Sequence, residues 1–562
     1  MIPNSPVGAL FAALLIAAGC LHAASLPVTI NVNSDKVVGD LRPIYRFFGY
    51  DEPNYTYMKD GKKLLSQLAE LSPLPVYVRA HNLLTSGDGT PSLKWGSSNA
   101  YTEDANGKPV HDWTITDRIF DTYVERGMKP LVEIGFMPEA LSTNPRPYRH
   151  GFSLEPLNRS TAGGWAYPPT DYSKWAELIY QWVRHCAGKY GKAEVESWYW
   201  EVWNEPNIGY WRGTPEEYHK LYDYTADALK RALPTARIGG PHSTGPDNEK
   251  AREFLRAFLE HCIRGKNHVT GAVGSPLDYV GFHAKGQPRV AGDHVQMGIR
   301  YQLADINRGF EMVASFPELR GKPVVIGESD PEGCAACSAR VFPQNAYRNG
   351  TMYSSYTAAS FARKHDLAAR HGVNFLGAVT WAFEFEDQPW FDGFRDLATN
   401  GVEKPVLNVF RMFGMMGNER VEAESSGSAG LDAMLREGVR ADPDVGVLAS
   451  RGNRKVTVMI WHYHDDDVAG PDAAVALSVS GLGASRALLR HFRVDREHSN
   501  SYEAWKRMGS PRQPAPGQVA ELERAAALEM AASPAWIDLK AGTATARFTL
   551  PRQGVSLIEF SW

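Results

Sequence analysis

The pattern of apolar and polar positions divides the chain into regions of different character. From about residue 43 to 415, short apolar runs of strand length alternate with segments whose apolar residues recur every three or four positions, as on one face of a helix. Strands that alternate with helices predict βα units and a parallel sheet. Eight strands are expected, at Arg46–Tyr50, Val76–His81, Pro130–Phe136, Trp198–Trp203, Arg237–Pro241, Asp278–His283, Pro323–Glu328 and Phe375–Phe383.

The helical segments carry their own start and stop signals. Asp112–Gly127 begins with polar residues and ends at glycine, and Ser355–Gly372 also ends at glycine. Thr214–Pro234 begins with Thr-Pro-Glu-Glu, which resembles a capping box, and ends at proline. Eight strands with helices between them predict an α/β fold, a closed (β/α)8 TIM barrel over residues 43–420. An open doubly wound sheet is the alternative, but no glycine-rich phosphate loop follows the first strand.

After about Met416 the helical alternation stops and short strands follow one another, which predicts a β-sandwich over residues 421–562. Leu26–Val38 alternates like a strand, so residues 25–42 are expected to join this sandwich. The polar stretch Glu422–Ala429 is the expected boundary with the barrel. Within the sandwich we expect strands at Val456–Trp461, Ala474–Ser478 and Thr545–Leu550 and one helix at Gly517–Ala532.

Residues 1–24 resemble a targeting signal. Val7–Ala18 is apolar, too short to span a bilayer and followed by small residues, which predicts a signal peptide and an exported protein, periplasmic or extracellular. The segment before it lacks Lys and Arg, which is atypical. Ala17–Cys20 resembles a lipoprotein box, in which Cys20 would be lipidated; cleavage near Ala23 or Ala24 is the alternative. No later apolar run reaches spanning length, so no transmembrane segment is expected.

Composition narrows the classes of partner and cofactor. The formal net charge is −4, so the chain has no basic excess, and neither nucleic acid nor an anionic membrane is an expected partner. Cys334 and Cys337 form a C-x-x-C, but no second pair with metal-ligand spacing and no nucleotide motif accompanies them, so we expect no metal and no cofactor. In an exported protein this pair is expected to be a local disulfide or a free thiol pair.

Two glutamates stand at the ends of predicted strands. Asn204-Glu205-Pro206 closes the fourth strand, and Gly327-Glu328 closes the seventh. Because the C-terminal ends of barrel strands meet at one face, both carboxylates are expected at the barrel mouth. Glu201 lies mid-strand and is expected to be structural, whereas Glu133 could line the cleft.

Six segments, in the same order, resemble glycoside hydrolase family 39, whose members are (β/α)8 retaining enzymes. The resemblance covers nearly the whole mature chain. It implies cleavage of O-glycosidic bonds by double displacement, with Glu205 as general acid/base and Glu328 as nucleophile. The matching segments are Val78–Asn82, Val132–Leu141, Trp200–Asn207, Val324–Pro331, Lys404–Phe413 and His491–Pro511.

These roles set physical requirements. In a retaining enzyme the two carboxyl groups lie about 5–5.5 Å apart. Glu328 must be ionised to attack, and Glu205 must first be protonated, so we expect burial and the charge of Glu328 to raise the pKa of Glu205. Asn204 is expected either to hydrogen-bond the sugar 2-hydroxyl or to cap a turn.

Other strand ends supply candidate residues for the sugar pocket. By resemblance, His81 after the second strand is a ligand of a sugar hydroxyl; a buried structural histidine is the alternative. Trp381, at the end of the eighth strand, is a candidate stacking platform or a core residue. His242 and His283, which end strands five and six, are further candidates.

Lys285 is the point at which the chain departs from the xylosidase pattern. Xylosidases of the family tend to have His-x-Tyr after strand six, whereas His283-Ala284-Lys285-Gly286 resembles the α-L-iduronidase branch, in which the lysine holds a substrate carboxylate. A lysine in a cleft needs a counter-ion. Glu328, Asp387 and a substrate carboxylate are the candidates.

The sequence therefore leaves the sugar open. An exo-acting β-xylosidase for xylo-oligosaccharides is the first hypothesis, and a glycosidase for a uronic acid, arabinose or galactose is the second. A non-catalytic carbohydrate-binding protein is the hypothesis from another class, but it would require the loss of one carboxylate, and both are present. In each case the expected partner is an oligosaccharide or a glycoside.

Overall fold

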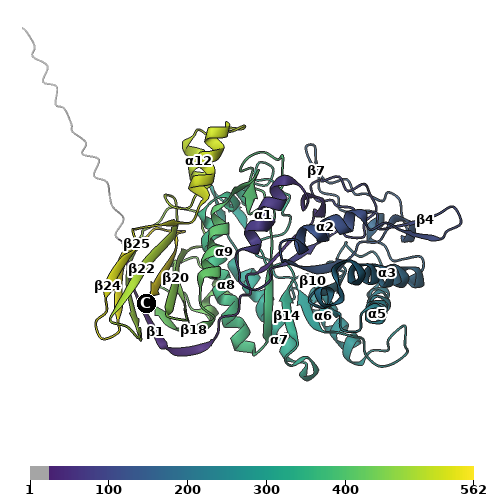
Figure 1. The fold of residues 1–562 in the computed structure, drawn as a ribbon, viewed down its shortest axis with the longest axis horizontal. Helices are drawn as coiled ribbons and strands as arrows, with labels where there is room; N and C mark the ends of the chain where they lie inside the picture. The colour runs from purple at the N-terminus through teal and green to yellow at the C-terminus, as the bar shows by residue number, and fades with distance from the viewer. Residues whose placement is uncertain (1–24) are drawn as a thin grey trace, which may run out of the picture.

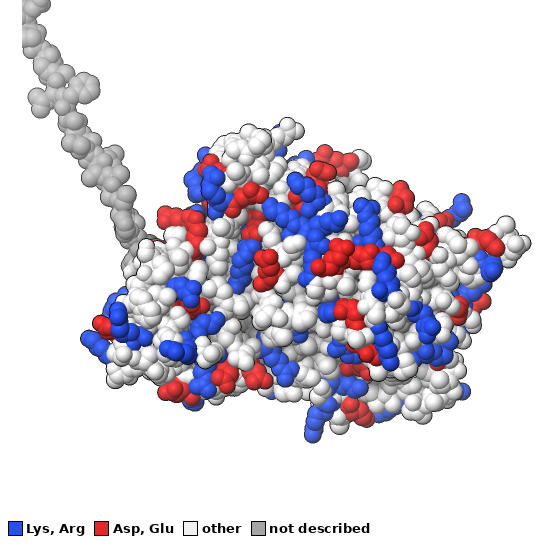
Figure 2. Space-filling view, viewed as in Figure 1, with Lys and Arg blue, Asp and Glu red and all other residues white. Residues whose placement is uncertain are grey.

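The computed structural model describes residues 25–562, which form a strand–helix barrel beside a module rich in strands (Figure 1). The predicted signal peptide and the lipidation of Cys20 fall outside the described residues. In the described part of the chain no helix is long and apolar enough to cross a membrane. On the face shown in Figure 2, the side chains of Lys and Arg are interleaved with those of Asp and Glu rather than gathered into one basic surface.

Eight parallel strands close into a barrel in the order β10-β11-β14-β15-β2-β3-β6-β9. Each strand therefore pairs with the barrel strands that precede and follow it in the sequence, which is the winding of a TIM barrel and confirms the predicted fold. The strands are β2 (Phe47–Tyr50), β3 (Tyr77–Ala80), β6 (Lys129–Ile134), β9 (Tyr199–Val202), β10 (Arg237–Ser243), β11 (Tyr279–Phe282), β14 (Pro323–Ile326) and β15 (Asn374–Trp381).

The helices surround the barrel, and their ends follow local capping chemistry. Thr214 and Glu217 form the expected capping box: the Thr214 hydroxyl accepts a bond of 3.1 Å from the Glu217 N–H, and the Glu217 carboxylate accepts one of 2.7 Å from the Thr214 N–H. Gly372 ends its helix in the left-handed conformation that glycine adopts without strain. The helices are α1 (Lys59–Ala69), α2 (Thr114–Val124), α3 (Tyr172–Tyr190), α4 (Lys192–Glu196), α5 (Pro215–Ala232), α6 (Glu249–Arg264), α7 (Ile299–Ala314), α8 (Thr351–His371) and α9 (Pro405–Met415).

Four small hairpins stand in the loops after barrel strands β3, β6, β11 and β15. They lie on the side of the barrel where TIM-barrel active sites are built, because these loops leave the C-terminal ends of the strands. The strand pattern did not predict them, since their strands are only two or three residues long. The hairpins are β4 (Tyr101–Glu103) with β5 (Pro109–His111), β7 (Ser153–Leu154) with β8 (Leu157–Asn158), β12 (Arg289–Ala291) with β13 (His294–Gln296), and β16 (Ala398–Thr399) with β17 (Val402–Glu403).

A second sheet of ten strands contains both ends of the described chain. Its strand β1 (Leu26–Asp40) lies between β18 and β21, antiparallel to the first and parallel to the second. The expected boundary at Glu422–Ala429 is wrong, because Glu419–Ser425 form β18 and pair with β1. The other elements of this part are β19 (Asp444–Gly452), β20 (Lys455–Tyr463), β21 (Ala473–Ser480), β22 (Arg486–Val494), β23 (Glu529–Met530), β24 (Ala535–Asp538), β25 (Ala544–Leu550), β26 (Val555–Ser561), α10 (Leu431–Glu437), α11 (Ser501–Arg507) and α12 (Pro516–Ala526).

The ten-stranded sheet encloses its own hydrophobic core. Along β1, Val28, Ile30 and Val32 are buried while the residues between them are exposed, as the period of two in a strand requires. These side chains belong to one apolar cluster with Leu477 of β21 and Phe560 of β26. The sheet therefore folds over its apolar face, and a second, larger core joins the barrel and its helices to the other face of strands such as β20 and β26.

Candidate active site

A strained turn after β9 brings the Glu205 side chain to the C-terminal end of the barrel. Trp203 and Glu205 both adopt positive φ, at 70° and 42°, which costs a non-glycine residue about 1–3 kcal/mol unless the surroundings enforce it. Two backbone bonds of 3.1 Å hold the turn, from the Trp203 N–H to the Ile134 carbonyl and from the Glu205 N–H to the His242 carbonyl. The neighbouring strands β6 and β10 thus fix the position of the carboxylate.

Glu328 reaches the same face through Gly327 at the end of β14. A Cβ on Gly327 would lie 2.0 Å from Nδ1 of His242, so only glycine allows this strand to pass the buried imidazole. The Gly327 N–H donates to the Phe282 carbonyl at 2.8 Å, and the Ser329 N–H donates to the Val379 carbonyl at 2.9 Å. Bonds to both adjacent strands therefore hold Glu328 in place.

The two carboxylates and one imidazole converge. One oxygen of Glu205, one of Glu328 and a ring nitrogen of His283 all lie within 4.8 Å of one another. His283 Nδ1 is 2.9 Å from Oε1 of Glu205. Such a set could ligate a divalent cation. However, the Lys285 ammonium already forms an ion pair with Glu328 and lies 3.6 Å from Glu205, so it serves as the counter-ion.

A buried arginine supports the site from inside the barrel. Arg79 is fully buried and binds Glu201 at 2.5 Å, Glu133 at 3.0 Å and Glu328 at 3.3 Å. It also donates to Oδ1 of Asn204 at 3.0 Å. Glu201 and Glu133 therefore share the same buried surroundings around Arg79, away from the cavity lining, which agrees with the structural role expected for Glu201. The bond from Arg79 to Oδ1 fixes the orientation of the Asn204 side-chain amide.

His81 lies between carboxylates on both sides. Its Nδ1 is 2.9 Å from Asp51, and its Nε2 is 3.2 Å from Glu133 and 3.5 Å from Glu328. Burial opposes protonation of His81, but Glu133 and Asp51 outweigh it and raise the pKa of His81 to about 9. Trp381 donates its indole N–H to Asp51 at 3.2 Å. Contact of His81 with a sugar hydroxyl stays a prediction.

The surroundings lower the pKa values of both glutamates, and that of Glu328 lies well below its ordinary value. Burial favours the neutral form of Glu328, but Lys285, His283 and His81 hold its pKa well below the ordinary value. For Glu205, burial again raises the pKa, but Lys285 and His283 lower it by more. The expectation of a raised pKa for Glu205 is therefore wrong, because the Lys285 ammonium 3.6 Å away and the bond from His283 together outweigh burial.

A cavity of about 220 Å³ opens above these groups. Six of its fourteen lining residues were predicted from the sequence as site residues, and the other eight were not. Asp51 could have been found, because it directly follows the first barrel strand, as Glu205 and Glu328 follow theirs closely. The lining consists of Asp51, His81, Lys94, Phe152, Arg159, Thr161, Asn204, Glu205, Tyr210, Lys285, Glu328, Gly333, Cys334 and Trp381.

Asp387 does not belong to this site, which corrects the expectation from the sequence. It is exposed, and it lies outside the cavity lining. The chain turns outward after β15, where Asp387 has a φ of 63° and its N–H donates to Asn400 at 3.0 Å. The counter-ion of Lys285 is Glu328 rather than Asp387.

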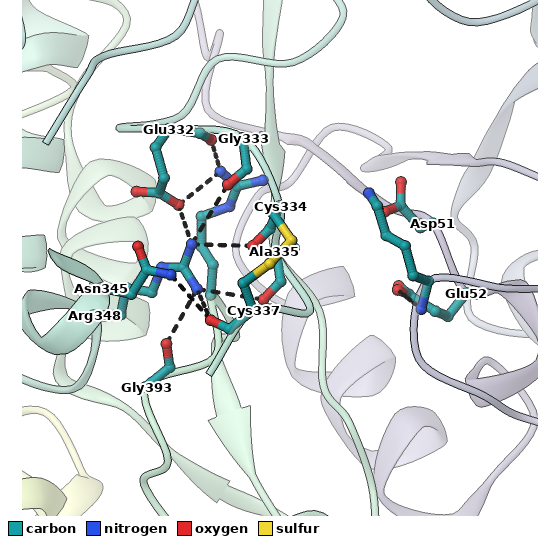
Figure 3. The surroundings of a disulfide bond; sticks show 12 residues. Asp51, Glu52, Glu332, Gly333, Cys334, Ala335, Cys337, Asn345, Arg348 and Gly393 are labelled. Atoms are coloured by element: carbon teal, nitrogen blue, oxygen red, sulfur yellow. Dashed lines mark hydrogen bonds and ion pairs between the residues drawn. A yellow bond between two sulfur atoms is a disulfide. The ribbon is translucent and has the colours of Figure 1, made fainter. Parts of the chain in front are cut away.

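A disulfide between Cys334 and Cys337 stiffens one wall of the cavity (Figure 3). The buried Arg348 donates to the carbonyls of Cys334 and Cys337 at 3.1 and 2.7 Å and to the Glu332 carboxylate at 2.5 Å. Figure 3 shows these bonds converging on one guanidinium. The loop that lines the cavity is thus fixed by a covalent link and by a buried cation.

The geometry can now be compared with known proteins. The model of "Glycosyl hydrolases family 39" matches residues 28–539. The chain belongs to glycoside hydrolase family 39. As a family 39 enzyme it is an O-glycoside hydrolase, which excludes the non-catalytic hypothesis.

Similar proteins carry two different activities in their names. A β-xylosidase of Geobacillus stearothermophilus is 26% identical over 450 residues, 78% of this chain and 77% of that protein. A solved bacterial orthologue of human α-L-iduronidase has a TM-score of 0.76 at 19% identity and covers 96% of this chain and 84% of its own. A monomeric β-xylosidase from Caulobacter crescentus CB15 has a TM-score of 0.72 at 22% identity and covers 95% and 99%. At these identities, the solved structures show the fold alone.

Proposed function

We propose that this family 39 enzyme is a retaining exo-glycosidase that hydrolyses β-xylosides, with Glu328 as nucleophile and Glu205 as general acid/base. The observation that carries the proposal is the separation of the two carboxylates, whose nearest oxygens lie within 4.8 Å. Retaining enzymes place the carboxyl groups about 5–5.5 Å apart, whereas inverting enzymes leave about 6.5–9.5 Å for a water molecule.

The first half of the reaction forms a bond to Glu328. Its carboxylate attacks the anomeric carbon, the glycosidic C–O bond breaks, and Glu205 transfers its proton to the departing oxygen. The depressed pKa of Glu328 keeps this nucleophile ionised. The Lys285 ammonium stabilises the ionised form of Glu205 and so lowers its pKa. Because Glu205 must be protonated to act as the acid, we expect the active pH range to lie on the acidic side of neutrality.

The second half hydrolyses the glycosyl ester. Water attacks the anomeric carbon, Glu205 takes the proton of that water, and the Glu328 carboxylate departs. Esterification removes the negative charge of Glu328, which had raised the pKa of Glu205. Lys285 remains 3.6 Å from Glu205 and stabilises its carboxylate form, so the same residue can serve as base.

The size of the cavity supports exo action. Its volume of about 220 Å³ is below the roughly 300–1,000 Å³ typical of sites for drug-sized ligands. A space of this size suits one sugar ring, with the rest of the substrate outside. The 26% identity to a β-xylosidase over most of both chains favours xylose as that sugar.

Lys285 favours a second candidate, a uronic acid in the same position. Its side chain is 24% exposed and lines the cavity, so a substrate carboxylate could share it with Glu328. A direct test uses a panel of aryl glycosides that includes a β-xyloside and an α-L-iduronide, with NMR of the first-formed sugar. Release of xylose with its anomeric configuration unchanged supports the proposal. An inverted anomer would contradict the assignment of Glu328 as nucleophile. Turnover of the uronide alone would mean that the hydrolysed sugar is a uronic acid rather than xylose.

A further inference from the structure

The hairpin β7–β8 carries an aromatic ring and a cation to the mouth of the cavity. Its register pairs Leu154 with Leu157 and Ser153 with Asn158. The next position outward therefore places Phe152 opposite Arg159, and both line the cavity. Neither residue belongs to a barrel strand, and the mechanism above uses neither of them.

The hairpin reaches the loop with the disulfide on the other side of the mouth. The Arg159 guanidinium lies 5.2 Å from the centre of the Phe342 ring. Glu155, in the turn of the hairpin, forms an ion pair of 2.8 Å with Arg340. Both partners follow Cys337, so the two loops meet across the opening. At this distance the Phe342 ring makes a cation–π contact, which favours this position of the Arg159 guanidinium.

Within the described part of the chain, no carboxylate pairs with Arg159. Of the other cations in the cavity wall, Lys94 is paired with Asp51, and Lys285 is paired with Glu328. Within residues 25–562, no ion pair and no side-chain hydrogen bond engages the guanidinium of Arg159. It is exposed to solvent at the opening, whereas His81 and Trp381 at the closed end are 2% and 1% exposed.

We propose that Arg159 is a specificity-determining residue that selects a leaving group with an anionic substituent, a carboxylate or a sulfate. The inference rests on the proposed function. In a cavity with one opening the hydrolysed sugar occupies the closed end, so the leaving group points toward the mouth. There Phe152 offers a ring face for a sugar or aryl group, and Arg159 offers planar, paired donors that suit a carboxylate or sulfate.

The test compares leaving groups that differ in charge. The substrates are 3-carboxyphenyl, 3-sulfooxyphenyl and neutral 3-carbamoylphenyl β-xylosides, or the same aryl series on whichever sugar the panel above identifies. We expect Arg159→Gln to lower kcat/KM for a charged substrate relative to the neutral one by about two- to fivefold, the range of an ion pair that keeps contact with water. The ratio of ratios cancels differences in leaving-group reactivity. Added salt should shrink the preference of the wild-type enzyme.

Two variants control the experiment. Arg159→Lys keeps the charge and should retain most of the preference. Arg149→Gln removes another exposed arginine of the same loop, 5.1 Å from the Trp95 ring and outside the cavity, and should behave like the wild type.

An unchanged ratio in Arg159→Gln overturns the inference, and so does an equal fall in Arg149→Gln, which would indicate a general field effect. In both cases turnover of the neutral glycoside leaves the proposed function standing. If no glycoside is hydrolysed at all, the proposed function fails, and the inference fails with it. A response to only one of the two anions names the substituent.

Discussion

Replacement of Lys285 by methionine should move the whole active pH range upward. In the proposed mechanism Glu328 must be ionised and Glu205 protonated for the first step, so activity should rise through the pKa of Glu328 and fall through that of Glu205. Lys285 lowers both values, because its ammonium pairs with Glu328 and lies 3.6 Å from Glu205. Without this cation the ionised form of each carboxylate is less stable. Both pKa values, and with them both limbs of the profile, should therefore rise.

The size of the shift follows from what remains around each carboxylate. Loss of an opposite charge at this distance changes a carboxyl pKa by about 1–3 units. Glu328 keeps Arg79 at 3.3 Å and His81 at 3.5 Å, so its limb should move by about the lower figure. Glu205 keeps only the bond of 2.9 Å from His283, so its limb should move farther. Since the two carboxylates titrate together, the limbs report values of the pair.

The assay is kcat/KM of a neutral aryl glycoside as a function of pH for the wild type, Lys285→Met and Lys285→Arg. The arginine variant keeps the positive charge and should keep both limbs near their wild-type positions. Limbs that do not move in Lys285→Met would refute the electrostatic reasoning. A loss confined to a uronide, with the xyloside profile intact, would assign Lys285 to substrate binding instead.

Three other perturbations test the site. Glu328→Ala should lose nearly all activity, and added azide should restore turnover and yield a glycosyl azide of inverted configuration. Glu205→Ala should retain more activity on substrates with good leaving groups, which need no proton. Equal losses on good and poor leaving groups would contradict this division of roles. Arg79→Met should lower the free energy of unfolding by about 3–5 kcal/mol, because buried carboxylates lose their counter-ion; urea unfolding measures it, and a change below about 1 kcal/mol would contradict it. Cys337→Ser should lower the free energy of unfolding by about 2 kcal/mol, because the disulfide closes so short a loop. It should raise KM more than it lowers kcat, since Arg348 still holds the cavity wall. An unchanged KM would show that the disulfide does not influence substrate binding.

The barrel could be predicted from the sequence because its strands are apolar runs bounded by polar chemistry. Glu205 and Glu328 were found for the same reason, since each closes such a run near the strand's C-terminal end. Asp51 likewise follows the C-terminal end of an apolar strand, β2, but it was not among the predicted site residues. Burial of each strand on both faces thus predicts where the chain leaves the barrel, and hence where its polar side chains converge.

The cavity mouth could not be predicted in this way. Phe152, Arg159 and Thr161 stand on or beside a hairpin whose strands have two residues each, too short for any periodicity. Lys94 comes from an irregular loop and reaches Asp51 only through tertiary packing. The predicted direction of the pKa shift of Glu205 was wrong for a related reason. The sequence identified Lys285 as a site residue, but it could not show that the Lys285 ammonium lies between Glu205 and Glu328.

The strand β1 is synthesised long before the strands with which it pairs. Thr29 in β1 bonds to Ser426, 397 residues later, and the strand lies between two strands of the C-terminal sheet. At the usual rate of synthesis of about 5–20 residues per second, its partners emerge roughly 20–80 s after it. Until then the apolar side chains of β1 and both of its edges are uncovered, a state prone to aggregation. A barrel truncated after α9 would keep β1 without its partners β18 and β21, so a cut at that point does not yield two independent modules.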